Sequence, residues 1–453
     1  MSTTVDKNRY NLREISLEIL MEILENGVHV DTALHQTLKH YQELGRMERS
    51  FINRLVKGTV ERVIELDYRI DACSTIRTKK MKPVIRQILR MSVYQMVYME
   101  QVPDSAACNE AVKLVKKRKI YNLQGFVNGV LRAVSRQKDA FRFPDKGKDF
   151  ALYLQIKYSL PSWLSGFFLS TYGKELAEKM AAYYLETSPL CVRYCGANEK
   201  QWQEKLESSG IKAVKSEGLS YAYRLYQIDK VEQIPGYAEG EFVVQDESSM
   251  LVAHVAGIKP GMKVLDICAA PGGKSLHSAL LTGENGCVIA RDLTSYKVDK
   301  IKENARRMKL HHIQAEVKDA LVYMEEDKEK YDVVLADLPC SGLGVIGKKC
   351  DIKYNMSLKT MEELVLLQRD ILKNAVDYVK PGGCLMYSTC TVNPSENEKQ
   401  VEWILHNFPL RPVPLKESLP DFFAGDMGDE CYLQLYPGVH QTDGFFLAKF
   451  QKD

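Results

Sequence analysis

Two cysteines of this 453-residue chain stand in surroundings that suit thiol chemistry. Cys340 lies within the run Asp337–Gly342 (DLPCSG), and Cys390 follows Tyr387–Thr389 (YST). A thiolate is a strong nucleophile, and the ordinary cysteine pKa of about 8.5 falls where neighbours or a helix N-terminus stabilise the anion. A thiolate that adds to C6 of a pyrimidine makes C5 electron-rich, so that C5 can take a methyl group. The alternative is that both are small buried hydrophobic residues, as free cysteines commonly are.

A turn of small residues further upstream could bind a ligand through its backbone. Its seven residues are Cys268, Ala269, Ala270, Pro271, Gly272, Gly273 and Lys274. Two glycines let backbone N–H groups approach a ligand closely, and the start of a helix is expected directly after them. The turn lacks the Gly-x-x-x-x-Gly-Lys-Ser/Thr pattern, so a triphosphate-binding loop is disfavoured. A tight turn without a ligand is the alternative.

Aspartates close the predicted strands that follow this turn. Asp292 lies 26 positions after Asp266, where a carboxylate can accept both hydroxyl groups of a ribose. Asp319 ends the next strand and could accept from an adenine amino group. Each acid alone is more often a helix cap. Three consecutive strand ends that close on acids favour a ligand.

The elements that carry these residues are short apolar strands alternating with helices. Strands are predicted at 263–268, 287–292, 313–319, 331–337 and 383–390, with helices between most of them, including 295–308 and 364–379. This alternation predicts parallel βαβ units and a Rossmann-like α/β core. In such sheets ligands bind beyond the carboxyl ends of the strands, where the cysteines and aspartates fall.

The first 140 residues have a different pattern. Apolar residues recur there at helical spacing without strand alternation, which predicts a compact all-α module of five or more helices. Gly27 and Gly45 are predicted helix stops, and Pro83 and Pro103 are predicted helix starts.

The chain is therefore expected to contain several domains. Residues 1–140 form the predicted helical domain, and the polar stretch 136–149 reads as a linker. Residues 150–240 fit a small α+β domain, with helices at 150–159 and 161–185 before short strands. Residues 241–453 form the predicted α/β core.

Composition excludes several classes of protein. Hydrophobic residues make up 45% and charged residues 27%, as in ordinary soluble globular proteins. No apolar run reaches the roughly 18 residues that a membrane span needs, and residues 1–7 lack the apolar core of a signal peptide. The 11 cysteines, an odd number in a long chain, favour a reducing cytosol over a disulfide framework, and no metal site is predicted. The nine cysteines other than Cys340 and Cys390 are expected to be structural.

Charge is unevenly distributed along the chain. Residues 1–140 hold 24 Lys and Arg against 16 Asp and Glu, although the whole chain carries a net charge of only +3. The densest basic runs are Lys113, Lys116, Lys117, Arg118 and Lys119, and Lys79, Lys80 and Lys82. Such runs are usually solvated faces, but a basic first domain is also typical of proteins that bind an anionic partner such as RNA.

The motifs of the α/β core together resemble those of the RNA cytosine-C5 methyltransferase family (the NOL1/NOP2/Sun group). The resemblance rests on six motifs that have the family's order and spacing, namely Asp266–Lys274, Asp337–Gly342, Tyr387–Thr391, Gln245–Ser249, Asn393–Glu398 and Asp443–Phe446. The first domain resembles the NusB RNA-binding fold through Ile88–Met91, Val102–Pro103, Asn109–Val112 and Phe126–Arg132. This fusion is similar to bacterial enzymes that methylate 16S ribosomal RNA.

The resemblance implies roles for the residues described above. S-adenosylmethionine would be the methyl donor, with Cys268–Lys274 lining its loop, Asp292 at the ribose, Asp319 at the adenine and Asp337 at the methionine end. It implies that Cys390 is the nucleophile and that Cys340 assists product release. DNA cytosine-C5 enzymes instead use a Pro-Cys thiol, which would make Cys340 the nucleophile.

One stretch departs from the family pattern. After Gly344–Ile346 the family has a basic residue and then a proline before Asp351, whereas this chain has Gly347 and Cys350. Lys348 and Lys349 keep positive charge nearby.

The partner expected from the resemblance is 16S ribosomal RNA in an unfolded or loop region of an early small-subunit precursor, because a stacked base cannot reach a buried thiol. A cytoplasmic monomer without membrane association is expected. Two alternatives stay open. The substrate could be tRNA, or the chain could be a non-catalytic RNA-binding factor for assembly or antitermination, which the intact cysteines and aspartates disfavour.

Overall fold

The computed structural model describes residues 10–425 and 427–453, and contacts between backbone segments divide the chain into two compact units. The first comprises residues up to Leu185 together with Ile346–Asn355, and the second comprises Glu186–Val345 and Met356–Asp453. The stretch 1–7, used above to argue against a signal peptide, lies outside the described residues. In the part of the chain that is described, no helix is long and apolar enough to cross a membrane.

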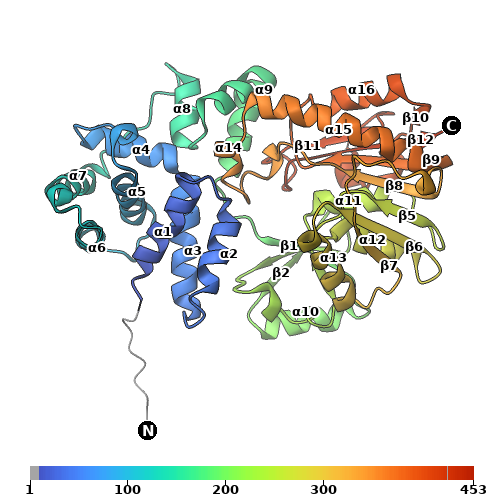
Figure 1. Ribbon diagram of the computed structural model, residues 1–453, viewed down its shortest axis with the longest axis horizontal. Helices are drawn as coiled ribbons and strands as arrows, with labels where there is room; N and C mark the ends of the chain where they lie inside the picture. The colour runs from blue at the N-terminus through green and yellow to red at the C-terminus, as the bar shows by residue number, and fades with distance from the viewer. Residues whose placement is uncertain (1–9, 426) are drawn as a thin grey trace, which may run out of the picture. The chain divides into compact units, whose positions relative to one another are not determined.

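The first unit is helical (Figure 1), and its helices up to residue 140 confirm the all-α character predicted for that stretch. Its helices are α1 (Leu12–Leu24), α2 (Val30–Lys39), α3 (Arg46–Glu61), α4 (Val63–Cys73), α5 (Pro83–Tyr98), α6 (Asp104–Lys117), α7 (Gln124–Gln137), α8 (Phe150–Lys157), α9 (Ser162–Tyr183) and α14 (Ile352–Asn355). Helix α5 is buried on most of its circumference and packs against α1, α3, α4, α6 and α7, which makes it the centre of this core.

Three of the four residues predicted to start or end a helix are confirmed by the helix boundaries. Pro83 is the first residue of α5, Pro103 immediately precedes α6, and Gly27 follows α1 with a φ of 73°. The prediction for Gly45 was wrong, because this glycine starts a helix instead of ending one. It precedes α3, and its N–H donates to the Glu48 carboxylate at 2.7 Å, which caps the first turn.

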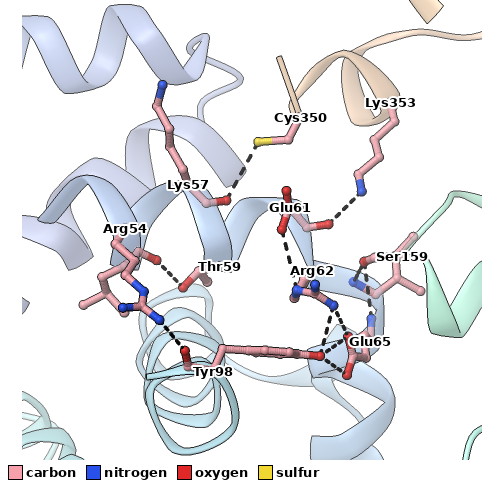
Figure 2. Close-up of polar contacts among 12 residues, drawn as sticks. Arg54, Lys57, Thr59, Glu61, Arg62, Glu65, Tyr98, Ser159, Cys350 and Lys353 are labelled. Atoms are coloured by element: carbon pink, nitrogen blue, oxygen red, sulfur yellow. Dashed lines mark hydrogen bonds and ion pairs between the residues drawn. The ribbon is translucent and has the colours of Figure 1, made fainter. Parts of the chain in front are cut away.

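The segment Ile346–Asn355 contains the two departures from the family pattern, and it packs within the helical unit. Cys350 is buried in the helical core. Lys353 Nζ donates to the carbonyl oxygen of Glu61, the last residue of α3, at 2.7 Å (Figure 2). A Cβ atom at position 347 would lie 3.3 Å from the Tyr184 Cα atom, so a glycine fits there more easily than a basic residue.

Burial of Lys353 makes the stability of this unit depend on pH. Desolvation lowers the pKa of the Lys353 ammonium to about 8, whereas the unfolded chain keeps an ordinary lysine pKa. Between these two values the unfolded state binds more protons than the folded state, so the free energy of unfolding rises with pH.

Lys353→Met removes this contribution. We expect the stability of the wild type relative to Lys353→Met to increase by about 2 kcal/mol between about pH 7 and about pH 10. Denaturant unfolding of both proteins at the two pH values measures the difference. Lys113→Met, at an exposed lysine on α6, is the control and should show no such pH-dependent gap. If the stability of the wild type relative to Lys353→Met stays constant or falls between these pH values, the lowered pKa of Lys353 is wrong.

The second unit contains two sheets (Figure 1). The smaller is antiparallel with order β2-β3-β1-β4, and the larger has order β10-β12-β9-β8-β5-β6-β7, with β11 paired to β12. The strands are β1 (Leu190–Tyr194), β2 (Lys212–Lys215), β3 (Ala222–Tyr226), β4 (Phe242–Val244), β5 (Lys263–Asp266), β6 (Cys287–Asp292), β7 (Ile313–Val317), β8 (Tyr331–Asp337), β9 (Val379–Thr389), β10 (Leu410–Pro412), β11 (Tyr432–Leu435) and β12 (Phe445–Lys452). The helices are α10 (Glu199–Ser208), α11 (Glu247–Val255), α12 (Gly273–Thr282), α13 (Ser295–Arg307), α15 (Leu358–Tyr378), α16 (Glu398–Asn407) and α17 (Asp421–Ala424).

The five predicted strands of the core are confirmed as β5 to β9, which run parallel to one another. Strand β8 shows why they read as apolar runs. Val333 and Leu335 pack toward α11, whereas Val334 and Ala336 pack toward α15, so both faces are covered. From β5 the chain builds outward through β6 and β7, and then returns to the other side of β5 with β8 and β9. The point at which the strand order reverses, the topological switch point, therefore lies between β5 and β8, and sheets of this kind bind ligands there.

Candidate active site

The two candidate thiols lie side by side. Cys340 follows β8 by three residues, Cys390 follows β9 directly, and their Sγ atoms are 3.4 Å apart. The parallel pairing of β8 with β9 brings both strand ends to one edge of the sheet. The hydrogen bond to Cys390 and burial raise the pKa of the Cys340 thiol well above its usual value. At this separation either thiol can donate a hydrogen bond to the other sulfur.

Asp337 connects this thiol pair to the glycine-containing turn. Its Oδ2 atom accepts from Lys274 Nζ at 2.7 Å, and its Oδ1 atom accepts from Ser388 Oγ at 2.8 Å. These partners come from α12 and from β9. Three elements thus fix one carboxylate beside the ends of β8 and β9, and Ser388 is a site residue that the sequence did not single out.

The turn itself has the close packing that a backbone cradle requires. Gly272 has a φ of 107°, a conformation that favours glycine, and α12 begins at Gly273. Ala270 N–H donates to Asp292 Oδ2 at 2.9 Å, and Leu293 N–H donates to Asp292 Oδ1 at 2.8 Å. Asp292 is buried, so its carboxylate holds the turn against the end of β6.

Asp319 lies two residues after β7 and is exposed. Its Oδ1 atom accepts from the Leu321 N–H at 3.0 Å, and together with Ile267 and Lys318 it lines a small pocket at the carboxyl end of the sheet.

Asp266, at the end of β5, is a further candidate that the sequence signalled only as a strand-ending acid. It is fully buried, its Oδ2 atom accepts from Ser275 Oγ at 2.6 Å, and its Oδ1 atom has no hydrogen-bond partner among the described residues. Burial raises its pKa to about 7. Burial raises the pKa of the Cys268 thiol, and the nearby carboxylates of Asp266, Asp292 and Asp337 raise it further, so these acidic groups lie around the turn. A ligand with cationic groups fits this surrounding.

No cluster of metal-ligating side chains occurs within residues 10–425 and 427–453. The carboxyl edge of the large sheet brings together the thiols of Cys340 and Cys390 and the Asp337 carboxylate. The strand order and the glycine-containing turn at the switch point define the second unit as a Rossmann-like α/β domain, to which an N-terminal helical unit is fused.

Comparisons with known proteins identify the family. The model of the 16S rRNA methyltransferase RsmB/F family matches residues 254–451, and that of the NusB family matches residues 10–136. The chain is 36% identical to the probable ribosomal RNA small subunit methyltransferase B of Bacillus subtilis, an alignment that covers 98% of this chain and 99% of that protein. A methyltransferase homologue from Pyrococcus horikoshii aligns in three dimensions with a TM-score of 0.58 and 25% identity, over 68% of this chain and 100% of that one. The chain belongs to the RsmB/F family of 16S rRNA methyltransferases.

Proposed function

We propose that this protein methylates C5 of one cytosine in 16S ribosomal RNA through a covalent bond between Cys390 and C6 of the base. The observation that carries the proposal is the pair of thiols 3.4 Å apart at the ends of neighbouring parallel strands. One reactive thiol would suffice for attack. A second thiol in contact with the first fits a reaction in which the bond between the attacking sulfur and the base must later be broken.

The proposed cofactor is S-adenosylmethionine, which the family implies and which supplies a methyl group on a positively charged sulfur. The acidic surrounding of the turn fits a ligand with sulfonium and ammonium charges. Following the family resemblance, we assign the cofactor loop to Cys268–Lys274, the ribose to Asp292, the adenine to Asp319 and the methionine end to Asp337. The Oδ1 atom of Asp266, which has no hydrogen-bond partner among the described residues, adds an acceptor for the ammonium group.

In the proposed reaction the Cys390 thiol loses its proton and its sulfur bonds to C6. The electron pair of the C5–C6 double bond would move to C5, which would take the methyl group as its bond to the cofactor sulfur breaks and that sulfur becomes a neutral thioether. A base removes the C5 proton, the double bond forms again, and Cys390 leaves as a thiolate. The contact between the two thiols suits this division of roles, because a Cys340 thiol beside Cys390 can stabilise the departing thiolate by a hydrogen bond.

The RNA partner is proposed to contact the basic residues of the helical domain. The runs at 113–119 and 79–82 include exposed lysines and arginines. Three of these cations already contact acidic side chains, namely Lys113 with Glu110, Lys117 with Glu14, and Arg118 with Glu18. Phosphate groups would compete with these exposed ion pairs, which are individually weak.

The finer identity of the substrate rests on the family resemblance. We propose an unfolded or loop region of 16S RNA in an early small-subunit precursor, with cytosine 967 as the target. We further propose a cytoplasmic monomer with three domains at 1–140, 150–240 and 241–453. The chain passes from the first compact unit to the second between Leu185 and Glu186, inside the second of these ranges, so it is the range that limited proteolysis should probe.

Bisulfite sequencing of ribosomal and transfer RNA from the source cell, with and without this gene, tests the proposal. We expect one 16S methylcytosine to disappear without the gene and to return with a plasmid copy. Restoration by the wild type but not by Cys390→Ala would tie the loss to this active site. Loss at a tRNA position would keep the chemistry and reject the substrate. An unchanged RNA would favour a non-catalytic RNA-binding factor.

A further inference from the structure

A buried carboxylate, Glu396, contacts the loop that carries Cys340. Its side chain is fully buried and accepts four hydrogen bonds. The Oε2 atom accepts from the Ser341 N–H and from Gln368 Nε2, both at 2.9 Å. The Oε1 atom accepts from Ser341 Oγ at 2.5 Å and from Asn393 Nδ2 at 2.9 Å. Because an anion in a dry interior is costly unless donors surround it, these four bonds restrict where Ser341 can lie.

The same group of residues fixes the other side of Cys340. Gln368 Nε2, which donates to Glu396, also donates to the Pro339 carbonyl oxygen at 2.9 Å. Pro339 and Ser341 are the direct chain neighbours of Cys340. The backbone on both sides of this thiol is therefore held through Gln368 and Glu396.

Cys390 is held in a corresponding way by the next residue along the chain. Asn397 accepts from Thr389 Oγ1 at 2.6 Å and donates to the Thr391 carbonyl oxygen at 3.0 Å, so the two neighbours of Cys390 share one amide. The two loops are also joined directly, because Ser341 Oγ and Thr391 Oγ1 lie 2.7 Å apart. Glu396 and Asn397, adjacent in sequence, thus each secure one of the two thiols.

We propose that Glu396 is a positioning residue that holds Cys340 against Cys390, so that Cys340 can act when the covalent RNA bond is broken. This inference rests on the proposed covalent mechanism. It assigns a role to one residue of the stretch 393–398, to which neither the sequence motifs nor the family resemblance gave one. Glu396 touches neither sulfur through a hydrogen bond, and it acts through Ser341 and Gln368.

The test compares Glu396→Gln with Glu398→Gln. Glu398 is a second carboxylate of the same stretch, at the start of α16, and its Oε2 atom has no hydrogen-bond partner among the described residues. In Glu396→Gln the amide NH₂ must face groups that themselves donate, so the loop of Cys340 loses at least one of its bonds. Ser341→Ala removes only the hydroxyl group and serves as the milder second variant, should Glu396→Gln fail to fold.

Two measurements are made on each variant. Without RNA, iodoacetamide labelling across a pH series, resolved by mass spectrometry of the two cysteine peptides, reports the reactivity of each thiol. We expect Cys340 to react at least about tenfold faster at neutral pH in Glu396→Gln, because a nearby negative charge and a fixed contact with Cys390 are both lost. With RNA, we expect the covalent complex to persist and turnover to fall at least about tenfold. Glu398→Gln should match the wild type in both.

Unchanged Cys340 labelling in both Glu396→Gln and Ser341→Ala would overturn the proposal, even if turnover falls, because a general loss of structure would explain that fall. Failure of the proposed function is a separate outcome. If Cys340→Ala forms no covalent complex with RNA, the mechanism is wrong, while the labelling comparison still decides whether Glu396 positions Cys340.

Discussion

Replacing Cys340 with alanine is expected to trap the protein on its RNA, whereas replacing Cys390 with alanine is expected to abolish the covalent bond entirely. If Cys390 forms the bond to C6, its loss removes the nucleophile. If Cys340 assists release, its loss leaves bond formation and methyl transfer intact and slows only the last step. The 3.4 Å contact between the sulfur atoms makes either assignment geometrically accessible, so the two variants must be compared.

The measurement is the fraction of protein that migrates with labelled RNA on a denaturing gel after incubation with S-adenosylmethionine. We expect Cys340→Ala to convert most of the active protein into a stable adduct, and Cys390→Ala to give none above background. Cys384→Ala is the matched control, since Cys384 lies on β9, the strand that Cys390 directly follows, but outside the thiol pair, and it should behave as the wild type. An adduct with Cys390→Ala and none with Cys340→Ala would reverse the two roles and bring the protein in line with the Pro-Cys thiol of DNA enzymes.

The contact between the two cysteines shows which part of the site local sequence patterns could predict. The apolar runs predicted β8 and β9, and the parallel arrangement placed both cysteines at the carboxyl edge of one sheet. That the two strands are neighbours depends on strand order, which is set by packing across the whole sheet. The spacing of Cys340 and Cys390 along the chain therefore predicted a shared edge, but not a contact.

Residues that support the site were harder to predict, because their role depends on partners far away in sequence. Glu396 is 55 positions from Ser341, and Lys353 is 292 positions from the carbonyl oxygen that it caps. Gly45 shows the same limit at short range. A glycine after a polar turn is compatible with the end of one helix or the start of the next. Here Gly45 starts a helix, because the Glu48 carboxylate accepts a hydrogen bond from its N–H. Asp266 could have been found, since it closes a strand as Asp292 does.

The largest expected effect outside the thiols concerns Lys274. Lys274→Met should lower the rate of methyl transfer by about a hundredfold, the usual scale for removing one preorganised charged partner from an active site. Lys274 Nζ donates to Asp337 Oδ2 at 2.7 Å, and the lysine side chain is only 11% exposed. Without this cation, Asp337 keeps only Ser388 and can turn away from the strand ends. Asp337→Asn should cause a loss of similar size, because the neutral amide no longer forms the ion pair.

Single-turnover rates of methyl transfer, with saturating RNA and S-adenosylmethionine, measure these effects, and Lys300→Met is the control at an exposed lysine of α13. The double variant decides whether the two residues act as one unit. If Lys274 works only by holding Asp337, the double variant should be no slower than Asp337→Asn alone, since the lysine has nothing left to hold. Two losses that multiply would instead mean that Lys274 contacts the RNA or the cofactor independently of Asp337. Lys274 would then itself be a binding residue of the turn.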